Sequence, residues 1–206
     1  FIKMKKKMNN SSPTREMVDI ALKAAEEKNL DILEDIVKKM LIKHNNSAVS
    51  HLFNANLNNL KNDKKKTQEA FEKSLEIAPN YGEAHRQFAE FLRVNSNVKE
   101  AIYHAKTSNQ LNKNQASSYD TLGNVLVANN NFREAIKSYE KGLKINPNLT
   151  QMINNLGNAY RSTQQLQKSL LCFEKCIATD PDQPAYYTNL ALTYFEMENY
   201  TLALDY

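Results

Sequence analysis

Glycine is scarce in this chain, and no hydrophobic run is long. Four glycines occur among the 206 residues, and three of them occupy recurring positions in the pattern described below. No Gly-rich loop remains to hold a phosphate, which argues against P-loop and dinucleotide chemistry. No apolar run approaches the roughly 18 residues that a membrane-spanning helix needs, and residues 1–13 lack the apolar core of a secretory signal. We therefore expect no membrane partner and favour a cytoplasmic location.

Histidine and cysteine are also few, and none of them forms a familiar catalytic motif. The sequence has no Ser-His-Asp order, no HExxH and no nucleophile elbow. Cys172 and Cys176 are one helical turn apart and could share a metal, but no second ligand pair follows them. We interpret both as packed thiols, and His51 and His85 as packed core residues. We predict no catalytic residue, metal site, cofactor or enzymatic activity within this chain.

Basic residues gather at the N-terminus and are balanced elsewhere. Residues 1–13 carry four lysines and no acidic residue, so the other 23 basic residues (27 minus 4) equal the 23 acidic ones in number. A nucleic-acid surface needs clustered basic side chains across the fold, and we expect no nucleic-acid partner. We interpret residues 1–13 as a disordered, solvated leader, with a surface or partner contact as the alternative.

Three prolines show that the chain is periodic. Pro147 and Pro181 are 34 residues apart, and Pro79 precedes Pro147 by twice that distance. Lys113 occupies the intermediate position in a similar context. A fixed period of this length predicts a stacked array of repeats, and such arrays mostly bind other chains. The predicted units are 14–47, 48–81, 82–115, 116–149, 150–183 and a truncated unit at 184–206.

Each unit predicts two helices of about a dozen residues. Positions 4, 7, 8 and 11 of a unit follow the spacing of one apolar helix face, and positions 20, 24, 27 and 28 form a second face. A polar break separates the two, and the proline ends the second helix. Small residues at positions 8 and 20 are expected to let the two backbones approach. In the fourth unit these positions hold Tyr119, Leu122, Gly123, Leu126, Ala135, Tyr139, Gly142 and Leu143.

These residues resemble the tetratricopeptide repeat (TPR), most closely from residue 116 onward and more loosely in residues 48–115. The resemblance covers about residues 14–206. It implies an all-α fold, a right-handed superhelical solenoid of antiparallel helix pairs, with the first helix of each pair on the concave side. Unit 14–47 lacks the glycine and the proline, as expected of a solvent-facing cap. The last units are also similar to the repeat scaffold of O-linked N-acetylglucosamine transferase and its relatives.

The functional prediction depends on polar residues that the packing does not use. A side-chain amide has both a donor and an acceptor, so it can pair with the backbone of an extended peptide. In the transferase that these units resemble, such asparagines hold peptide. Arg161 and Arg93 both occupy position 12 of their units and could add charge contacts. The predicted peptide-binding residues are Asn124, Asn155, Asn158, Asn189, Arg161 and Arg93. The alternative is that these asparagines are merely a solvated face.

Two functions remain open at this stage. The first is a scaffold that binds a protein or peptide segment on its concave face. The second is the substrate-presenting region of a larger enzyme, resembling a glycosyltransferase or sulfotransferase, whose catalytic domain would follow residue 206. Because unit 184–206 stops within its second helix, we expect the chain to continue covalently. A chaperone-type carboxylate clamp is disfavoured, since the basic residues it requires are replaced by Asp120, Ala185 and Asn189.

Overall fold

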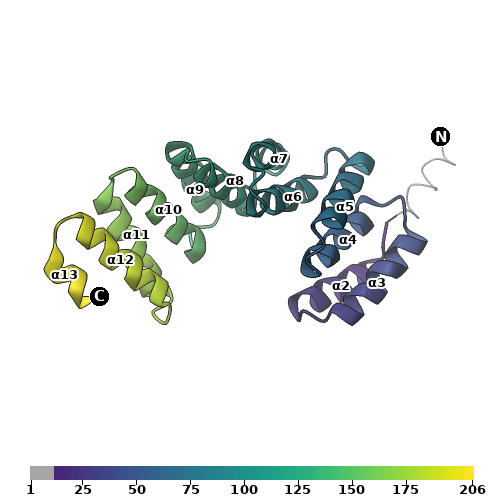
Figure 1. Ribbon diagram of the computed structural model, residues 1–206, viewed down its shortest axis with the longest axis horizontal. Helices are drawn as coiled ribbons and strands as arrows, with labels where there is room; N and C mark the ends of the chain where they lie inside the picture. Colours follow the sequence, from purple (N-terminus) through teal and green to yellow (C-terminus); the bar gives the residue numbers. More distant parts are fainter. Residues whose placement is uncertain (1–11) are drawn as a thin grey trace. The chain divides into compact units, whose positions relative to one another are not determined.

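The computed structural model describes residues 12–206, which form twelve helices and no strand (Figure 1). Residues 1–11, and with them most of the expected leader, lie outside the described residues. The all-α architecture of paired helices expected from the sequence is confirmed. No helix among the described residues is long and apolar enough to cross a membrane. The helices are α2 (Arg15–Glu26), α3 (Leu30–Lys43), α4 (Ala48–Leu60), α5 (Lys64–Ile77), α6 (Gly82–Val94), α7 (Val98–Leu111), α8 (Ala116–Ala128), α9 (Phe132–Ile145), α10 (Thr150–Ser162), α11 (Leu166–Thr179), α12 (Pro184–Glu196) and α13 (Tyr200–Asp205).

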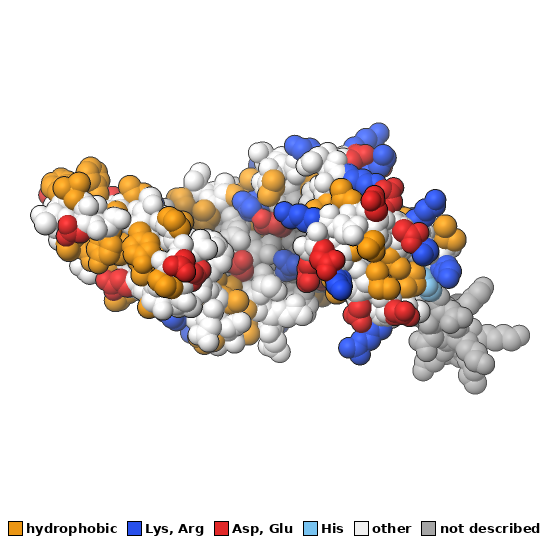
Figure 2. Space-filling view, turned by 90° about the horizontal axis from the view of Figure 1, so that it is seen from below, with side chains coloured by type: hydrophobic (Ala, Val, Ile, Leu, Met, Phe, Trp, Pro, Cys, Tyr) orange, Lys and Arg blue, Asp and Glu red, His pale blue; other side chains and the backbone are white. Residues whose placement is uncertain are grey.

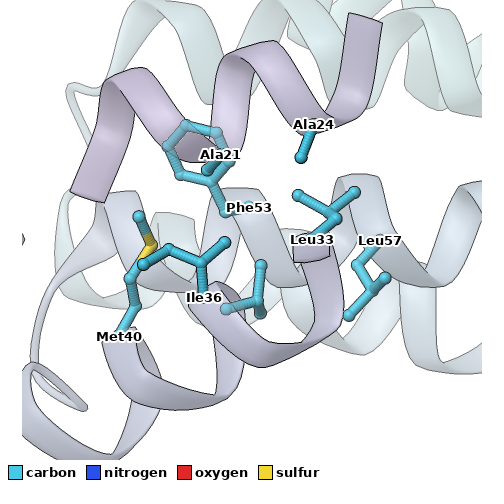
Figure 3. Close-up of a cluster of buried hydrophobic side chains, with 8 residues drawn as sticks. Ala21, Ala24, Leu33, Ile36, Met40, Phe53 and Leu57 are labelled. Atoms are coloured by element: carbon cyan, nitrogen blue, oxygen red, sulfur yellow. The ribbon is translucent and has the colours of Figure 1, made fainter. Parts of the chain in front are cut away.

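The chain divides into two compact units, Phe1–Phe88 and Ala89–Tyr206, and the boundary falls within α6. In the first unit, α2 packs on α3, α3 on α4 and α4 on α5. The core at its N-terminal side is shown in Figure 3, where side chains of α2, α3 and α4 converge. Leu33 and Met40 of α3 are fully buried there against Phe53 of α4. The apolar stripes of successive helices therefore bury one another.

The second unit repeats this arrangement from α7 to α13, each helix packing on the next. In addition, α8 contacts α10 and α10 contacts α12, so the first helices of neighbouring pairs also touch. Gly123 of α8 lies directly under the Tyr139 ring of α9, and Gly157 lies under Phe173. Both rings are almost completely buried. The predicted role of the small residue at position 8, which is to let two helices approach, is borne out at these two sites.

The turn inside each helix pair has the same backbone geometry in all six pairs. One residue adopts a left-handed conformation, with φ between 53° and 63°, and none of these residues is glycine. The next backbone N–H donates to the carbonyl five residues earlier at 2.8–3.0 Å, which is the Schellman arrangement that ends a helix. The left-handed residues recur every 34 positions, at Lys28, Asn62, Ser96, Asn130, Gln164 and Glu198.

Hydrophobic side chains gather at the α12–α13 end of the second unit, at the left of Figure 2. Phe195 is 60% exposed and Leu204 is 87% exposed, whereas Leu170, at the position of Leu204 in the preceding pair, is 6% exposed. Leu170 is covered by Leu190 of α12. Leu204 lies beside a hollow of about 340 Å³. The outer face of the last described pair is thus apolar and exposed.

Candidate functional site

Four of the six predicted site residues line one hollow of about 420 Å³ in the second unit. They are Arg93 of α6, Asn124 of α8, and Asn155 and Asn158 of α10. Two helices of successive pairs, α8 and α10, therefore bring together side chains that are far apart in the sequence. We call this space the central hollow; its lining consists of Arg93, Asp120, Asn124, Val127, Phe132, Tyr139, Gln151, Asn155, Asn158, Ala159 and Ser162.

Asn124 is held by the protein itself. Its Oδ1 accepts a hydrogen bond from the Tyr139 hydroxyl at 2.7 Å and a second one from Nδ2 of Asn155 at 3.0 Å. Its Nδ2 donates to Oδ2 of Asp120 at 3.4 Å. A carbonyl oxygen has two lone pairs, so this amide has no acceptor capacity left for a ligand. Asn124 anchors the hollow through these bonds, and its role in binding a peptide stays a prediction.

The Tyr139 hydroxyl is part of the same network. Burial, and next the charge of Asp120, raise the pKa of Tyr139 well above its ordinary range. The hydroxyl therefore keeps its proton at physiological pH and donates it to Asn124. Because the ring is also wedged against Gly123, the tyrosine fixes both the approach of α8 to α9 and the orientation of the Asn124 amide.

Asn155 and Asn158 keep hydrogen-bonding capacity on the side of the hollow. Asn155 Oδ1 accepts from Nε2 of Gln151 at 3.2 Å, and one of its two Nδ2 hydrogens is directed to Asn124. Asn158 Oδ1 accepts from Nη2 of Arg161 at 3.3 Å, which directs the Nδ2 group of that amide away from the arginine. Each side chain is half-buried. The hollow therefore offers amide N–H donors from α10 and the Gln151 carbonyl as an acceptor.

The two predicted arginines are neutralised by neighbouring carboxylates. Arg93 forms two hydrogen bonds with Glu90, at 2.9 and 2.5 Å, and these raise the pKa of the guanidinium. Nε of Arg161 lies 3.6 Å from Oε1 of Glu196. Its Nη1 is buried and has no hydrogen-bond partner among the described residues. The arginines orient neighbouring side chains and add little net charge to the surface.

Asn189 lies outside the central hollow, although it occupies the same repeat position as Asn155. Its Nδ2 donates to Oδ1 of Asn154 at 2.9 Å, and Asn154 is 8% exposed. Asn189 therefore joins α12 to α10. The sequence prediction did not include Asn154, Gln151, Tyr139 or Asp120. A buried tyrosine usually finds a partner for its hydroxyl, so Tyr139 opposite Asn124 is the one of these that the sequence could have suggested.

The remaining polar candidates are packed residues. His85 is buried and its Nε2 donates to the Pro79 carbonyl at 2.9 Å, while His51 is half-buried and bonds the Asn45 carbonyl at 2.8 Å. Burial raises the pKa of Cys172 to about 11 and, together with the neighbouring Cys172, that of Cys176 to about 12. Protonated thiols are poor nucleophiles and poor metal ligands. Among the described residues, no group of three or more His, Cys, Asp or Glu side chains could hold a metal.

Comparison with known proteins agrees with this architecture. Residues 123–161 and 157–198 match the family model of the TPR repeat. No curated protein is similar enough in sequence to count as a relative. The resemblance to tetratricopeptide repeats is therefore confirmed, whereas the finer likeness to the O-linked N-acetylglucosamine transferase scaffold stays a prediction.

Solved structures share the fold at low sequence identity. PilW, a widely conserved type IV pilus biogenesis factor, superposes with a TM-score of 0.84 at 14% identity, over 94% of this chain and 91% of its own. PilF of Pseudomonas aeruginosa superposes with a TM-score of 0.81 at 15% identity, over 92% of this chain and 86% of its own. YrrB, a TPR protein with an unusual peptide-binding site, superposes with a TM-score of 0.69 at 21% identity, over 82% of this chain and 87% of its own. At these identities the likeness shows the fold alone.

Proposed function

Because residues 123–198 are tetratricopeptide repeats, we propose that this chain is a protein-interaction scaffold that binds an extended segment of a partner in the central hollow. Binding, not catalysis, is its activity. Within the predicted concave face, the binding surface that we propose is the part formed by α8 and α10. YrrB, which shares the fold, has a peptide-binding site, and this supports the assignment by analogy.

The observation that carries the proposal is the polarity of the hollow. An extended peptide presents alternating N–H and C=O groups along its backbone, and each must find a partner when it is buried. Asn155 and Asn158 offer N–H donors and Gln151 offers a carbonyl. The Val127, Phe132 and Ala159 side chains provide apolar walls beside them. A site with a few fixed polar groups on an apolar surface suits a peptide.

The alternative function, a substrate-presenting region of a larger enzyme, is favoured by no contact among the described residues. Both functions would use the same binding surface. They differ in what the rest of a longer protein would do with the bound segment.

The test uses a displayed library of random 12-residue peptides selected on the purified chain. Binding of the selected peptides is then measured by fluorescence anisotropy for the Asn155→Ala/Asn158→Ala variant. Each net hydrogen bond contributes about 1 kcal/mol, so losing two should weaken binding roughly 10–30-fold. Gln167→Ala, an exposed amide on α11 outside the hollow, is the matched control and should bind normally.

Thermal melts must accompany these measurements, because Asn155 also bonds Asn124. A folded double variant that binds the selected peptides as tightly as the Gln167→Ala control would contradict the proposal. So would a library that returns no specific binder.

A further inference from the structure

The central hollow continues at both of its ends. At one end it shares Phe132 and Ser162 with a second hollow of about 450 Å³. At the other it shares Asp120 and Gln151 with a third of about 420 Å³. Because they share these lining residues, the three hollows adjoin one another. We call the three together the α8–α10 groove.

The groove follows the axes of the two helices. The second hollow lies where α8 and α10 end, beside Asn130 and Thr163, and the third lies where they begin, beside Ala116 and Thr150. Each helix has 13 residues, hence a length of roughly 20 Å at 1.5 Å per residue. An extended chain advances about 3.3 Å per residue. About six residues of an extended segment fill the groove.

This direction differs from the one that the asparagine ladder suggests. A ladder across successive repeats would run from α8 over α10 to α12 and would use Asn155 and Asn189 alike. None of the three hollows is lined by a residue of α12, and the Asn189 amide is directed to Asn154. The repeat symmetry of the sequence is thus broken at the site.

The charges of the groove nearly cancel. Its lining carries two positive side chains, Arg93 and Arg133, and two negative ones, Asp120 and Glu134. Because Arg93 is paired with Glu90 beside the lining, about one negative charge remains. Most of the other lining groups are amides, hydroxyls and apolar side chains. Such a surface attracts a strongly charged ligand only weakly, and its affinity for a ligand depends little on ionic strength.

We infer that the α8–α10 groove binds an uncharged, extended segment of about six residues that lies parallel to α8 and α10, not across the repeats. This inference rests on the proposed function and specifies the direction, length and charge of its ligand. Recognition then rests mainly on two adjacent helix pairs, with Arg93 of α6 as the one contribution from a third pair among the described residues.

Two variants at the same repeat position test the direction. With a peptide from the library selection, Asn155→Ala should raise Kd about fivefold, since it removes one net hydrogen bond. Asn189→Ala should leave Kd within about twofold of the parent, although it removes the same group from α12. An equal loss in both variants would restore the ladder and overturn the inference, while leaving the proposed function intact. No loss in either, with no loss in the Asn155→Ala/Asn158→Ala variant, would contradict the proposed function itself.

A spin label on either end of the peptide gives an independent test by NMR. A label on one end should broaden amide signals near Ala116 and Thr150, and a label on the other end those near Asn130 and Thr163. Broadening centred on Thr188 of α12 would contradict the groove direction. Affinity should also stop rising beyond about six residues and should change less than about twofold between 0.05 and 0.5 M salt. A steep salt dependence would contradict the uncharged ligand.

Discussion

Replacing Gly123 with alanine tests the helix packing that supports the site. A Cβ atom at this position would lie 2.3 Å from Cε1 of Tyr139 and 2.6 Å from Cζ. The ring is 1% exposed and its hydroxyl is bonded to Asn124, so it cannot move aside without opening the core. Overpacking of this kind costs about 1–3 kcal/mol, and loss of the hydroxyl bond adds about 1 kcal/mol. Alanine regains about 1 kcal/mol through its higher helix propensity.

The expected net loss is about 2 kcal/mol, or a fall in Tm of roughly 4–8 °C for a chain of this size. Gly142→Ala is the matched control in the partner helix α9. There the two nearest atoms to the added Cβ would be Sδ and Cε of Met152 at 2.8 and 2.9 Å, the end of a flexible side chain that can shift, and the third would be Cβ of Tyr119 at 3.1 Å. We expect that variant to stay within about 1 kcal/mol of the parent.

Urea denaturation followed by circular dichroism, with thermal melts, measures both variants. The close approach of Gly123 to Tyr139 would be refuted if Gly123→Ala were as stable as Gly142→Ala. In a Tyr139→Leu background the obstacle is smaller, so Gly123→Ala should cost less there than in the parent. Equal costs in the two backgrounds would point to a cause other than the ring.

Three further substitutions follow from the turns and the buried tyrosine. Gln164→Gly should stabilise the chain by up to about 1 kcal/mol, because the left-handed conformation at φ 59° strains a residue with a Cβ atom; unchanged or lower stability in urea would contradict this. Gln165→Asp should add about 0.5–1 kcal/mol by capping α11, since Gln165 makes no side-chain cap whereas Asp63 caps α5; a lower Tm would contradict it. The stabilisation from the protonated Tyr139 hydroxyl should be complete below pH ~10 and decline as the pH rises toward the higher pKa of the folded state. Tyr139→Phe should therefore lose less stability than the parent between pH 9 and 11, and identical pH profiles would contradict this account.

The helix pairs could be predicted because the apolar stripes and the proline positions repeat with a constant period. The same period identified Gly123 and Gly157 as points of close approach, since a small residue opposite an aromatic ring at fixed offsets has one simple packing explanation. These features depend on local spacing and on burial. The spacing is given by the sequence itself, and the apolar pattern predicts the burial.

The orientation of the amides could not be predicted in the same way. Asn155 and Asn189 are equivalent in sequence position, yet one faces Asn124 and the other faces Asn154. Which amide oxygen lies within reach of each Nδ2 group depends on how the helices pack, and the sequence alone does not give that packing. The left-handed turn residues show the same limit. Lys28 and Glu198 have no local preference for positive φ, so the hydrogen bonds of the turn impose it.

Packing between neighbours along the chain has a consequence for how the molecule folds and opens. Contacts that close short loops form quickly, so folding can nucleate in any helix pair and spread to the next. Opening should be piecemeal as well, with amide hydrogens near the ends of the stack exchanging before those at its centre. A segment bound between α8 and α10 should slow amide hydrogen exchange in those helices alone. The exchange rates of α2–α5 should not change.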